Sequence, residues 1–375
     1  MSESPNVCVI GVGMSAFGRH PEKSFEDLGE EAVKAALADA GLDYTAIDMA
    51  CCGHAMQGIT AGQRLLNRIG ATGIPIINVE NACATGSTAF HQAVMAVRAG
   101  VVDVALAVGF EKMQRGPLSA DARLSPPSQA QRSAPMPAMF AEVFRAHSKK
   151  YGTTVEQMAM VSVKNHRNAS HNPKAQYGIE VGVEDVIASR MVADPLTLMM
   201  CCPTSSGAAA AIIARADFAR TTPRKPATIV ASVLQSERGA SDPLAFVTEI
   251  NTRAASLAYK QAGLKPDDLD LIELHDCFAI AEIVHYENLG LCERGEGGKF
   301  VEQGLSAING RVSVSSSGGL LAKGHPLGAT GVAQIVEIVE QLRGESGPRQ
   351  VRDAKIGLAH CQGFGGASCI HILAA

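Results

Sequence analysis

The sequence lacks the long apolar stretches that membrane proteins carry. A membrane-spanning helix needs about 18 or more apolar residues in succession, and no segment of this chain approaches that length. The run Val7–Val12 is too short for the apolar core of a secretory signal, and the ending Ile372-Leu373-Ala374-Ala375 is not a peroxisomal address. We therefore expect a cytoplasmic protein with no membrane partner.

Basic tracts with interleaved aromatic residues are also missing. Aromatic residues make up 4% of the chain, and the formal net charge is -4. Proteins that act mainly on nucleic acid carry a basic patch or stripe, so we expect no nucleic-acid partner. The 375 residues are 46% hydrophobic and 19% charged, with a mean hydropathy of +0.09, which is typical of a globular chain of up to two domains.

No cysteine pair is followed by a second ligand pair at the spacing of a zinc site. The sequence has 10 cysteines, and we interpret the adjacent pairs Cys51-Cys52 and Cys201-Cys202 as core residues. In a reducing cytoplasm all of them should be thiols. We therefore expect no metal and no permanently bound cofactor.

Two sequence patterns occur twice, in the same order. Ala84-Thr85-Gly86 recurs as Ala329-Thr330-Gly331, and an arginine follows the glycine by 12 residues in both copies. Apolar residues at helical spacing fill the interval each time. Cys202 and Cys361 each precede a Gly-Ala pair by five residues. The chain is therefore predicted to contain an internal duplication.

Each predicted half alternates strands with helices. Each half reads strand, helix, strand, helix, strand. In the first half the first strand, first helix and last strand are Val7–Val12, Phe25–Ala40 and Val104–Gly109. In the second half they are Ala227–Val233, Thr248–Ala262 and Ile356–His360. Such alternation predicts an α/β fold with helices covering sheets. We place the two halves at residues 1–225 and 226–375, stacked through their central helices.

An insertion of about residues 112–191 interrupts the first half. Its proline- and serine-rich part, Gly116 to Pro137, favours neither helix nor strand. Helices are predicted after it, over Ala138–Tyr151 and Thr154–Ala169. We interpret the insertion as a segment that borders the substrate site or as a loop that supports a dimer. The two interpretations are compatible.

Cys83 lies between an apolar strand, Ile74–Val79, and an amphipathic run that ends near Arg98. This places its thiol at a helix N-terminus, where unpaired N–H groups favour a thiolate. Assisted by a cation or His, such a position can lower a thiol pKa from about 8.5 to roughly 3.5–7.5. We interpret Cys83 as a nucleophile and not as an inert buried cysteine.

Other reactive residues lie in glycine-rich or strand-end segments. His325 lies just before the helix of the second repeat. If a pseudo-twofold axis relates the two halves, this histidine should face Cys83 and act as the base that takes its proton. His275 directly follows the predicted strand Leu271 to Leu274, where α/β sites gather. Cys361 offers a further thiol, and the glycines after it allow backbone N–H groups to reach an oxyanion.

Four segments, in this order, resemble the active-site segments of thiolases: Asn81 to Thr88, His275 to Phe278, Gly324 to Gly331 and Cys361 to Gly366. The resemblance covers nearly the whole chain and is greatest to the sterol carrier protein-type thiolases. It implies a thiolase fold of five layers (αβαβα), and a homodimer or dimer of dimers. It also implies an acyltransferase that cleaves a 3-oxoacyl-CoA with CoA, or runs the reverse Claisen condensation in lipid metabolism.

The resemblance also implies roles for individual residues. Cys83 would carry the acyl group, His325 would take its proton, and His275 would bind the thioester oxygen. The N–H groups of Cys83 and Gly363 would hold the oxyanion. The second acid/base is either Cys361, which we slightly favour, or Cys277.

Substrate-binding residues are sought in the insertion and near these segments. An acyl pocket is expected at Met136, Met139, Phe140 and Phe278, although methionine clusters often only fill cores. His54 lines a dimer-side cavity or packs internally, and His91 is interpreted as a core or interface residue and not as a catalyst. Lys149, Lys164 and Arg167 could meet the phosphates of CoA, or form a solvated face.

Two alternatives remain open on the sequence alone. One is an acyltransferase or carbon–carbon lyase of the same fold that needs a small partner subunit. The other is a non-catalytic lipid or acyl-CoA binding protein. Acyl-chain specificity, which could extend to branched or aromatic groups, depends on the insertion.

Overall fold

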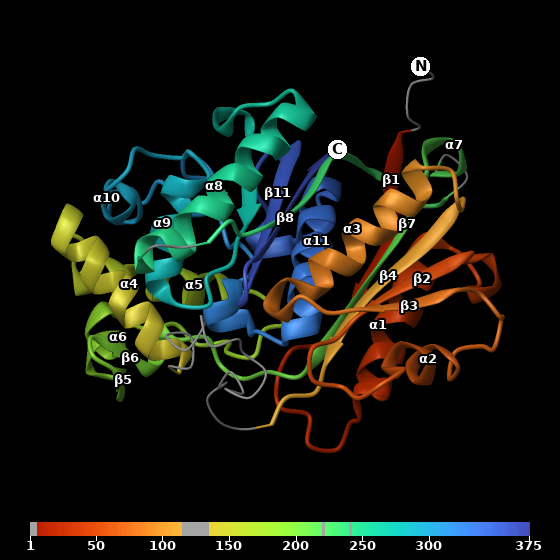
Figure 1. The fold of residues 1–375 in the computed structure, drawn as a ribbon, viewed down its shortest axis with the longest axis horizontal. Coiled ribbons are helices and arrows are strands. Elements are labelled where there is room, and N and C mark those ends of the chain that lie inside the picture. Colours follow the sequence, from red (N-terminus) through yellow and green to blue (C-terminus); the bar gives the residue numbers. More distant parts are fainter. Residues whose placement is uncertain (1–5, 115–134, 220–221, 240–241) are drawn as a thin grey trace.

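The computed structural model describes residues 6–114, 135–219, 222–239 and 242–375 (Figure 1). Within them, 10 strands form one mixed sheet in the order β10-β9-β11-β12-β8-β1-β7-β4-β2-β3. The strands are β1 (Val7–Met14), β2 (Met49–Gly53), β3 (Ile76–Val79), β4 (Val104–Glu111), β7 (Gly207–Arg215), β8 (Ala227–Ser236), β9 (Leu271–Glu273), β10 (Ser313–Val314), β11 (Ile356–Gly363) and β12 (Ala367–Ala374).

The sheet consists of the same five-stranded arrangement used twice. The order β1-β7-β4-β2-β3 in one half corresponds to β8-β12-β11-β9-β10 in the other. Strand directions agree as well: the first three strands of each set are antiparallel, and the next two pair in parallel. The halves join where Cys8 and Val9 pair with Thr228 and Ala227. The predicted duplication of an α/β half is thereby confirmed, and the predicted boundary at residues 225/226 stays a prediction.

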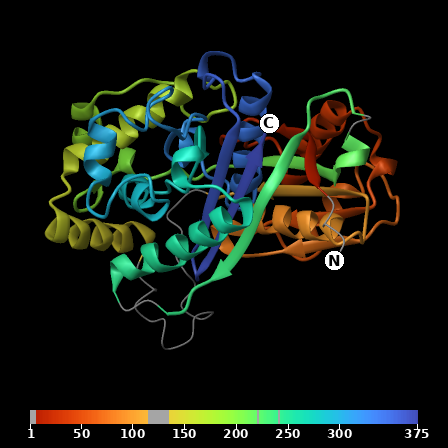
Figure 2. The ribbon, with the colours of Figure 1, turned by 90° about the horizontal axis from the view of Figure 1, so that it is seen from above.

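Helices complete five layers. Helices α3 (Thr85–Arg98) and α11 (Leu327–Arg343) pack against each other between the halves, and both touch strands of the two halves. Helix α1 (Phe25–Ala40) covers the outer face of β1, β7 and β4, whereas α8 (Pro243–Ala262) covers β8 and β12, with α9 (Ala279–Asn288) beside it. In Figure 2 the red-to-orange half lies on one side of the central strands and the yellow-to-cyan helices on the other.

Glycines allow the central helices to approach closely. A Cβ on Gly86 would meet the carbonyl oxygen of Gly328 at 2.5 Å, and one on Gly331 would meet the nitrogen of Ser87 at 2.3 Å. Any side chain at these positions would collide with backbone. The repeated Ala-Thr-Gly pattern is therefore the contact surface of the two helices.

The described part of the insertion is mostly helical and packs on the second half. It contains α4 (Met136–Tyr151), α5 (Val155–Ser170), α6 (Val183–Ala188) and the hairpin β5 (Met191–Ala193) and β6 (Leu196–Thr197). The predicted helices agree within two residues at each end. The expectation that residues up to Pro137 are irregular is wrong at its end, because Pro137 lies in the first turn of α4, where proline needs no N–H partner. Residues 116–134 lie outside the described part.

Short elements connect these layers. They are α2 (Ala61–Leu66), α7 (Ala216–Ala219), α10 (Gly297–Glu302) and single turns at η1 (Tyr44–Ala46), η2 (Ala82–Ala84), η4 (Leu198–Met200), η5 (Pro266–Asp268), η6 (Gly319–Lys323) and η7 (Gly347–Arg349). Among the described residues, no helix has both the length and the apolar character that crossing a bilayer requires.

Candidate active site

Cys83 lies in η2, the turn that leads from strand β3 into α3. Ala82 has a φ of 48°, a left-handed conformation that non-glycine residues rarely adopt. Hydrogen bonds hold this turn: the N–H of Asn81 donates to Thr85 Oγ1 at 2.8 Å, and its amide donates to Thr88 Oγ1 at 2.9 Å. The thiol is therefore held in place at the start of the helix, with 8% of the residue exposed.

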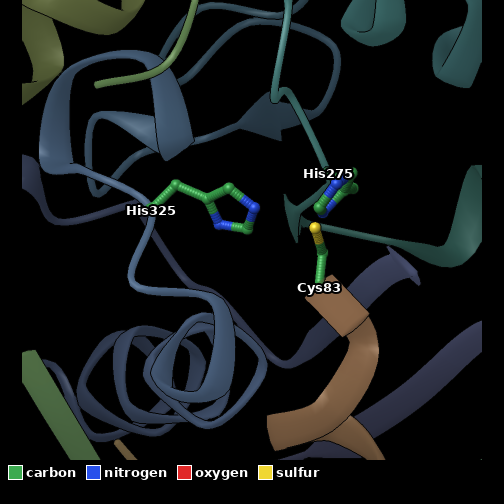
Figure 3. A group of neighbouring side chains, drawn as sticks. All are labelled: Cys83, His275 and His325. Atoms are coloured by element: carbon green, nitrogen blue, oxygen red, sulfur yellow. The ribbon is translucent and has the colours of Figure 1, made fainter. Parts of the chain in front are cut away.

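Cys83 meets two histidines (Figure 3). The sulfur and one ring nitrogen each of His275 and His325 all lie within 4.8 Å of one another. The two imidazole rings meet edge to face, with centroids 5.2 Å apart. His275 follows β9, and His325 precedes α11. Cys83 lies at the start of α3 and His325 at the start of α11, so the duplicated fold brings the cysteine against this histidine.

Neighbouring groups determine which nitrogen of His325 is free. The Thr330 hydroxyl donates its single proton to the carbonyl of Pro326 at 2.9 Å, and it lies 2.7 Å from His325 Nδ1. Thr330 must then accept from Nδ1–H, which leaves a lone pair on Nε2. Nε2 is buried and has no hydrogen-bond partner among the described residues. This nitrogen is free to take a proton in the site.

Cys361 connects the other histidine to the nucleophile's turn. Its thiol lies 3.0 Å from the carbonyl oxygen of Cys83 and 3.4 Å from Nδ1 of His275. Gly363, two residues on, lies against the same turn: a Cβ there would meet the carbonyl oxygen of Asn81 at 2.1 Å. Cys277 follows His275 by two residues and is 4% exposed.

Burial dominates the electrostatics of the site. It raises the pKa of Cys83 to about 12, although hydrogen bonds from the N–H groups of Phe364 and Cys83 itself oppose the shift. Burial also lowers the pKa of His325 to about 3 and that of His275 well below its ordinary value. The lowered thiol pKa predicted from the sequence is wrong, because desolvation exceeds the helix-end effect. The resting site holds a neutral thiol and two neutral imidazoles.

Two buried carboxylates that sequence reasoning missed hold the active-site loops. Glu111, at the end of β4, accepts from the N–H of Gly328 at 3.0 Å and from that of Ala55 at 2.9 Å. Asp276 accepts from the N–H of Leu320 at 2.8 Å. Each thus fixes the turn on one side of His325. Nothing in the spacing of the sequence marks either residue, because the partners are backbone groups far away along the chain.

Cys202 belongs to a pair that the sequence places in the core. Like Cys201, it packs against an apolar core cluster, as expected, but its N–H also donates to the carbonyl of Cys277 at 3.0 Å. It is also only partly buried. The pair Cys201-Cys202 therefore borders the His275–Phe278 segment.

The expected acyl-pocket residues do gather beside that segment. The ring of Phe140 stacks on that of Phe278 with centroids 4.4 Å apart. Met136 and Met139 pack against the same apolar cluster from the first turns of α4. His54 stacks on Phe110, with centroids 5.4 Å apart, and its ring nitrogens have no hydrogen-bond partner among the described residues.

The expected basic cluster is dispersed. Lys164 points inward and pairs with the buried Glu282 at 2.8 Å. It shares a cavity of about 440 Å³ with the exposed Arg167, between α5 and residues 304–308. Lys149 is exposed in the last turn of α4. His91, expected in the core or at an interface, is half-buried, and its Nδ1 lies 2.8 Å from the hydroxyl of Ser232.

Two duplicated α/β halves, with a cysteine and a histidine at the facing starts of their central helices, define the thiolase fold. A crystal structure titled human mitochondrial 3-ketoacyl-CoA thiolase has this fold: the TM-score is 0.76, with 19% identity and 99% coverage of both chains. Family models described as "Thiolase, N-terminal domain" and "Thiolase C-terminal domain-like" match residues 7–217 and 235–375. The chain belongs to the thiolase family, as its motifs predicted, and is therefore an acyltransferase.

Several relatives match almost the whole chain. "Acetyl-CoA acetyltransferase" of Methanothermobacter thermautotrophicus is 44% identical and covers 98% of this chain and 99% of its own. "Sterol carrier protein 2" of Bos taurus is 42% identical, over 98% of this chain and 72% of its own. "Benzoylsuccinyl-CoA thiolase subunit BbsB" of Thauera aromatica is 37% identical over 96% of this chain and 95% of its own length. A chain of a solved structure titled "Ltp2-ChsH2(DUF35) aldolase" is 28% identical with a TM-score of 0.85, and the match covers 100% of this chain and 99% of that chain.

Proposed function

We propose that the protein cleaves a 3-oxoacyl-CoA with CoA, or catalyses the reverse condensation, through an acyl group held on Cys83. The observation that carries this proposal is the approach of the Cys83 sulfur to the ring nitrogens of His275 and His325. A thiol beside a nitrogen that is held in its accepting form is the arrangement of an activated nucleophile.

In the first half-reaction the Cys83 thiol gives its proton to Nε2 of His325 as the sulfur attacks the 3-keto carbon. The bond between carbons 2 and 3 breaks, and its electron pair stays on carbon 2 of the departing acetyl-CoA. The N–H groups of Cys83 and Gly363 hold the developing oxyanion, while His275 and His325 bind the thioester oxygen. Because the site is buried and dry, such hydrogen bonds are worth more there than in water.

The departing carbanion takes its proton from a second acid, which we assign to Cys361. In the second half-reaction Cys361 takes the proton of CoA, whose sulfur then attacks the acyl group and frees Cys83. The closeness of the Cys361 thiol to both the Cys83 turn and His275 supports this choice over Cys277. Replacing Cys361 by alanine should then abolish turnover, whereas Cys277→Ala should retain most of it.

CoA and acyl-CoA are the proposed ligands, as substrates and not as permanent cofactors. Branched or aromatic acyl groups are included in the proposal because one relative is named as a subunit of a benzoylsuccinyl-CoA thiolase. A homodimer, a cytoplasmic location and a role in lipid metabolism complete the proposal.

A second candidate is a carbon–carbon lyase or acyltransferase that works with a small partner subunit. Two comparisons favour it: one relative is named as a subunit of a thiolase, and one similar solved chain comes from an aldolase whose title includes a DUF35 component. A third candidate is a non-catalytic acyl-CoA binding protein. It would have no need of the free nitrogen on His325.

The test is intact-protein mass spectrometry after mixing the protein with a panel of acyl-CoA and 3-oxoacyl-CoA thioesters. We expect an acyl adduct on Cys83 by peptide mapping, with the mass of the acyl group naming the substrate class. Cys83→Ala should give no adduct, whereas Cys292→Ser, which alters a cysteine outside the site, should react like the wild type. Binding without any adduct would favour the non-catalytic candidate. An adduct formed only after a co-purified partner is added would favour the second.

A further inference from the structure

The three groups that meet at the nucleophile are also a set of metal ligands. We propose that Cys83, His275 and His325 form a binding site for a thiophilic divalent cation, with Zn²⁺ as the representative ion, and that this ion blocks the nucleophile while no acyl substrate is present. Thiolate and imidazole are the ligands that zinc prefers in proteins. The site is separate in function from the acyl transfer proposed above, because its occupant prevents that reaction.

The distances allow such a site without a change of fold. Zinc binds sulfur at about 2.3 Å and imidazole nitrogen at about 2.0–2.1 Å, which places tetrahedral ligand atoms roughly 3.3–3.6 Å apart. In the structure the three ligand atoms lie within 4.8 Å of one another. Side-chain rotations that move each atom by about 1 Å would close the site. Three protein ligands would leave the fourth position open, as in catalytic zinc sites.

Both histidines already have the outer contacts typical of metal ligands. A ligating histidine usually donates its second ring N–H to a neighbouring group, which fixes the ring. Nδ1 of His325 donates to Thr330, and its buried Nε2 has no other partner in the described chain. The Cys361 thiol is 3.4 Å from Nδ1 of His275, which leaves the other nitrogen of that ring to bind. Figure 3 shows the His325 ring pointing toward the other two side chains.

The charges also favour a cation. Nε2 of His325 offers its lone pair to the site, because Nδ1 carries the ring proton toward Thr330. The thiol loses its proton to solvent as the metal–sulfur bond forms, and the dipositive ion stabilises the resulting thiolate.

The acyl substrate and the metal exclude each other in this geometry. An acyl group on Cys83 occupies the sulfur, and a bound thioester oxygen occupies the histidines. We therefore expect Zn²⁺ to inhibit competitively against the acyl substrate and to be released by a chelator. The acylated protein should not bind the ion at this site.

Titration calorimetry with zinc chloride alone, without substrate, tests the site independently of any activity. We expect one high-affinity ion per chain in the wild type and in the control Cys292→Ser. Cys83→Ser and His325→Ala should each weaken binding more than about 100-fold, and Thr330→Val by about 10- to 100-fold, the usual cost of a lost outer contact. Circular dichroism would establish that each variant is folded.

Cadmium binding to the wild type provides a second measurement that needs no variant. A sulfur-to-cadmium charge-transfer band that disappears on acylation of Cys83 would support the proposal. Equal zinc affinity in Cys83→Ser and wild type, or no high-affinity ion in the wild type, would overturn it. Neither outcome bears on acyl transfer, which the adduct experiment measures by itself.

Discussion

At the scale of single residues, the orientation of His325 depends on one hydroxyl. Thr330→Val keeps the shape but removes the acceptor for Nδ1–H, so the ring loses the contact that keeps Nε2 free. We expect kcat to fall about 10- to 100-fold, since small misplacements of a catalytic group have costs of this size, with a smaller change in KM. Steady-state kinetics beside Thr330→Ser, which keeps the hydroxyl, measures the effect. Equal kcat in the two variants would show that the contact is unimportant.

Glu111 gives a second prediction at this scale, because it connects the two halves of the fold. Its buried carboxylate accepts from N–H groups of Ala55, Met56 and Gly328. Glu111→Gln turns an N–H₂ group toward these donors, and hydrogen bonds to charged groups contribute about 1.5–3 kcal/mol each. We expect unfolding by urea to show a loss of at least about 2 kcal/mol.

The matched control for Glu111 is Glu142→Gln. Glu142 is exposed and, within the described ranges, pairs with Arg145 three residues further along the same helix. Surface substitutions of this kind usually change stability by less than about 0.5 kcal/mol. A loss as small in Glu111→Gln as in this control would refute the connecting role.

Residue types and their segments predicted that Cys83, His275 and His325 would come together, because glycine-rich turns and a helix start mark them in the chain. The carboxylates Glu111 and Asp276 could not be predicted in the same way. Their partners are backbone N–H groups that only the folded chain brings near. The direction of the thiol pKa was also beyond prediction, since it depends on how completely the folded site excludes water.

At the scale of elements, the contact between α3 and α11 depends on glycine. A Cβ on Gly331 would lie 2.3 Å from the nitrogen of Ser87. Alanine gains about 1 kcal/mol of helix propensity over glycine, but overpacking against backbone costs about 1–3 kcal/mol or more. We therefore expect Gly331→Ala to be less stable than wild type in thermal unfolding. Gly58→Ala is the control, because no atom of the residues that the structure describes lies within 4 Å of the added carbon. Equal melting temperatures would contradict tight packing.

Periodicity predicted the long helices well, because α1, α4 and α5 each have an apolar face and clear end signals. Thr154, for example, caps α5 in a capping box with Gln157. Short elements such as the β5–β6 hairpin could not be predicted. They have too few residues for a hydrophobic period to be recognised.

At the scale of the whole molecule, stability should fall in mild acid. Burial lowers the pKa of His325, His360 and His371 to about 3 each, against about 6.5 in an unfolded chain. Below pH 6.5 the unfolded chain therefore binds protons that the folded chain does not, and stability decreases as pH falls. Asp276 opposes this between about pH 7 and 4, because burial raises its pKa to about 7. The three histidines outweigh it, and His275 and His285, whose pKa values burial also lowers, add to their effect. We therefore expect a net loss of at least about 3 kcal/mol between pH 7 and 5.

Urea unfolding at several pH values measures this slope. His371→Gln should reduce it by about one proton, because this histidine is buried in neutral form. A free energy of unfolding that stays constant from pH 7 to 5 would show that these histidines are not buried in neutral form.

The duplicated α/β architecture was predictable because its repeats remain visible in the chain, as with Ala84-Thr85-Gly86 and Ala329-Thr330-Gly331. The joining of both halves into one sheet was not. That joint involves only the pairs at Cys8 and Val9, and no pattern distinguishes such a short contact from an unpaired strand end.

The short joint between β1 and β8 has a consequence for how this architecture can change over time. Each half has the same five-stranded order, and each supplies one central helix to the contact between them. Because both halves are encoded in one polypeptide, a substitution alters one side only. The cysteine lies in one half and His325 in the other, an asymmetry that a pair of identical chains cannot have.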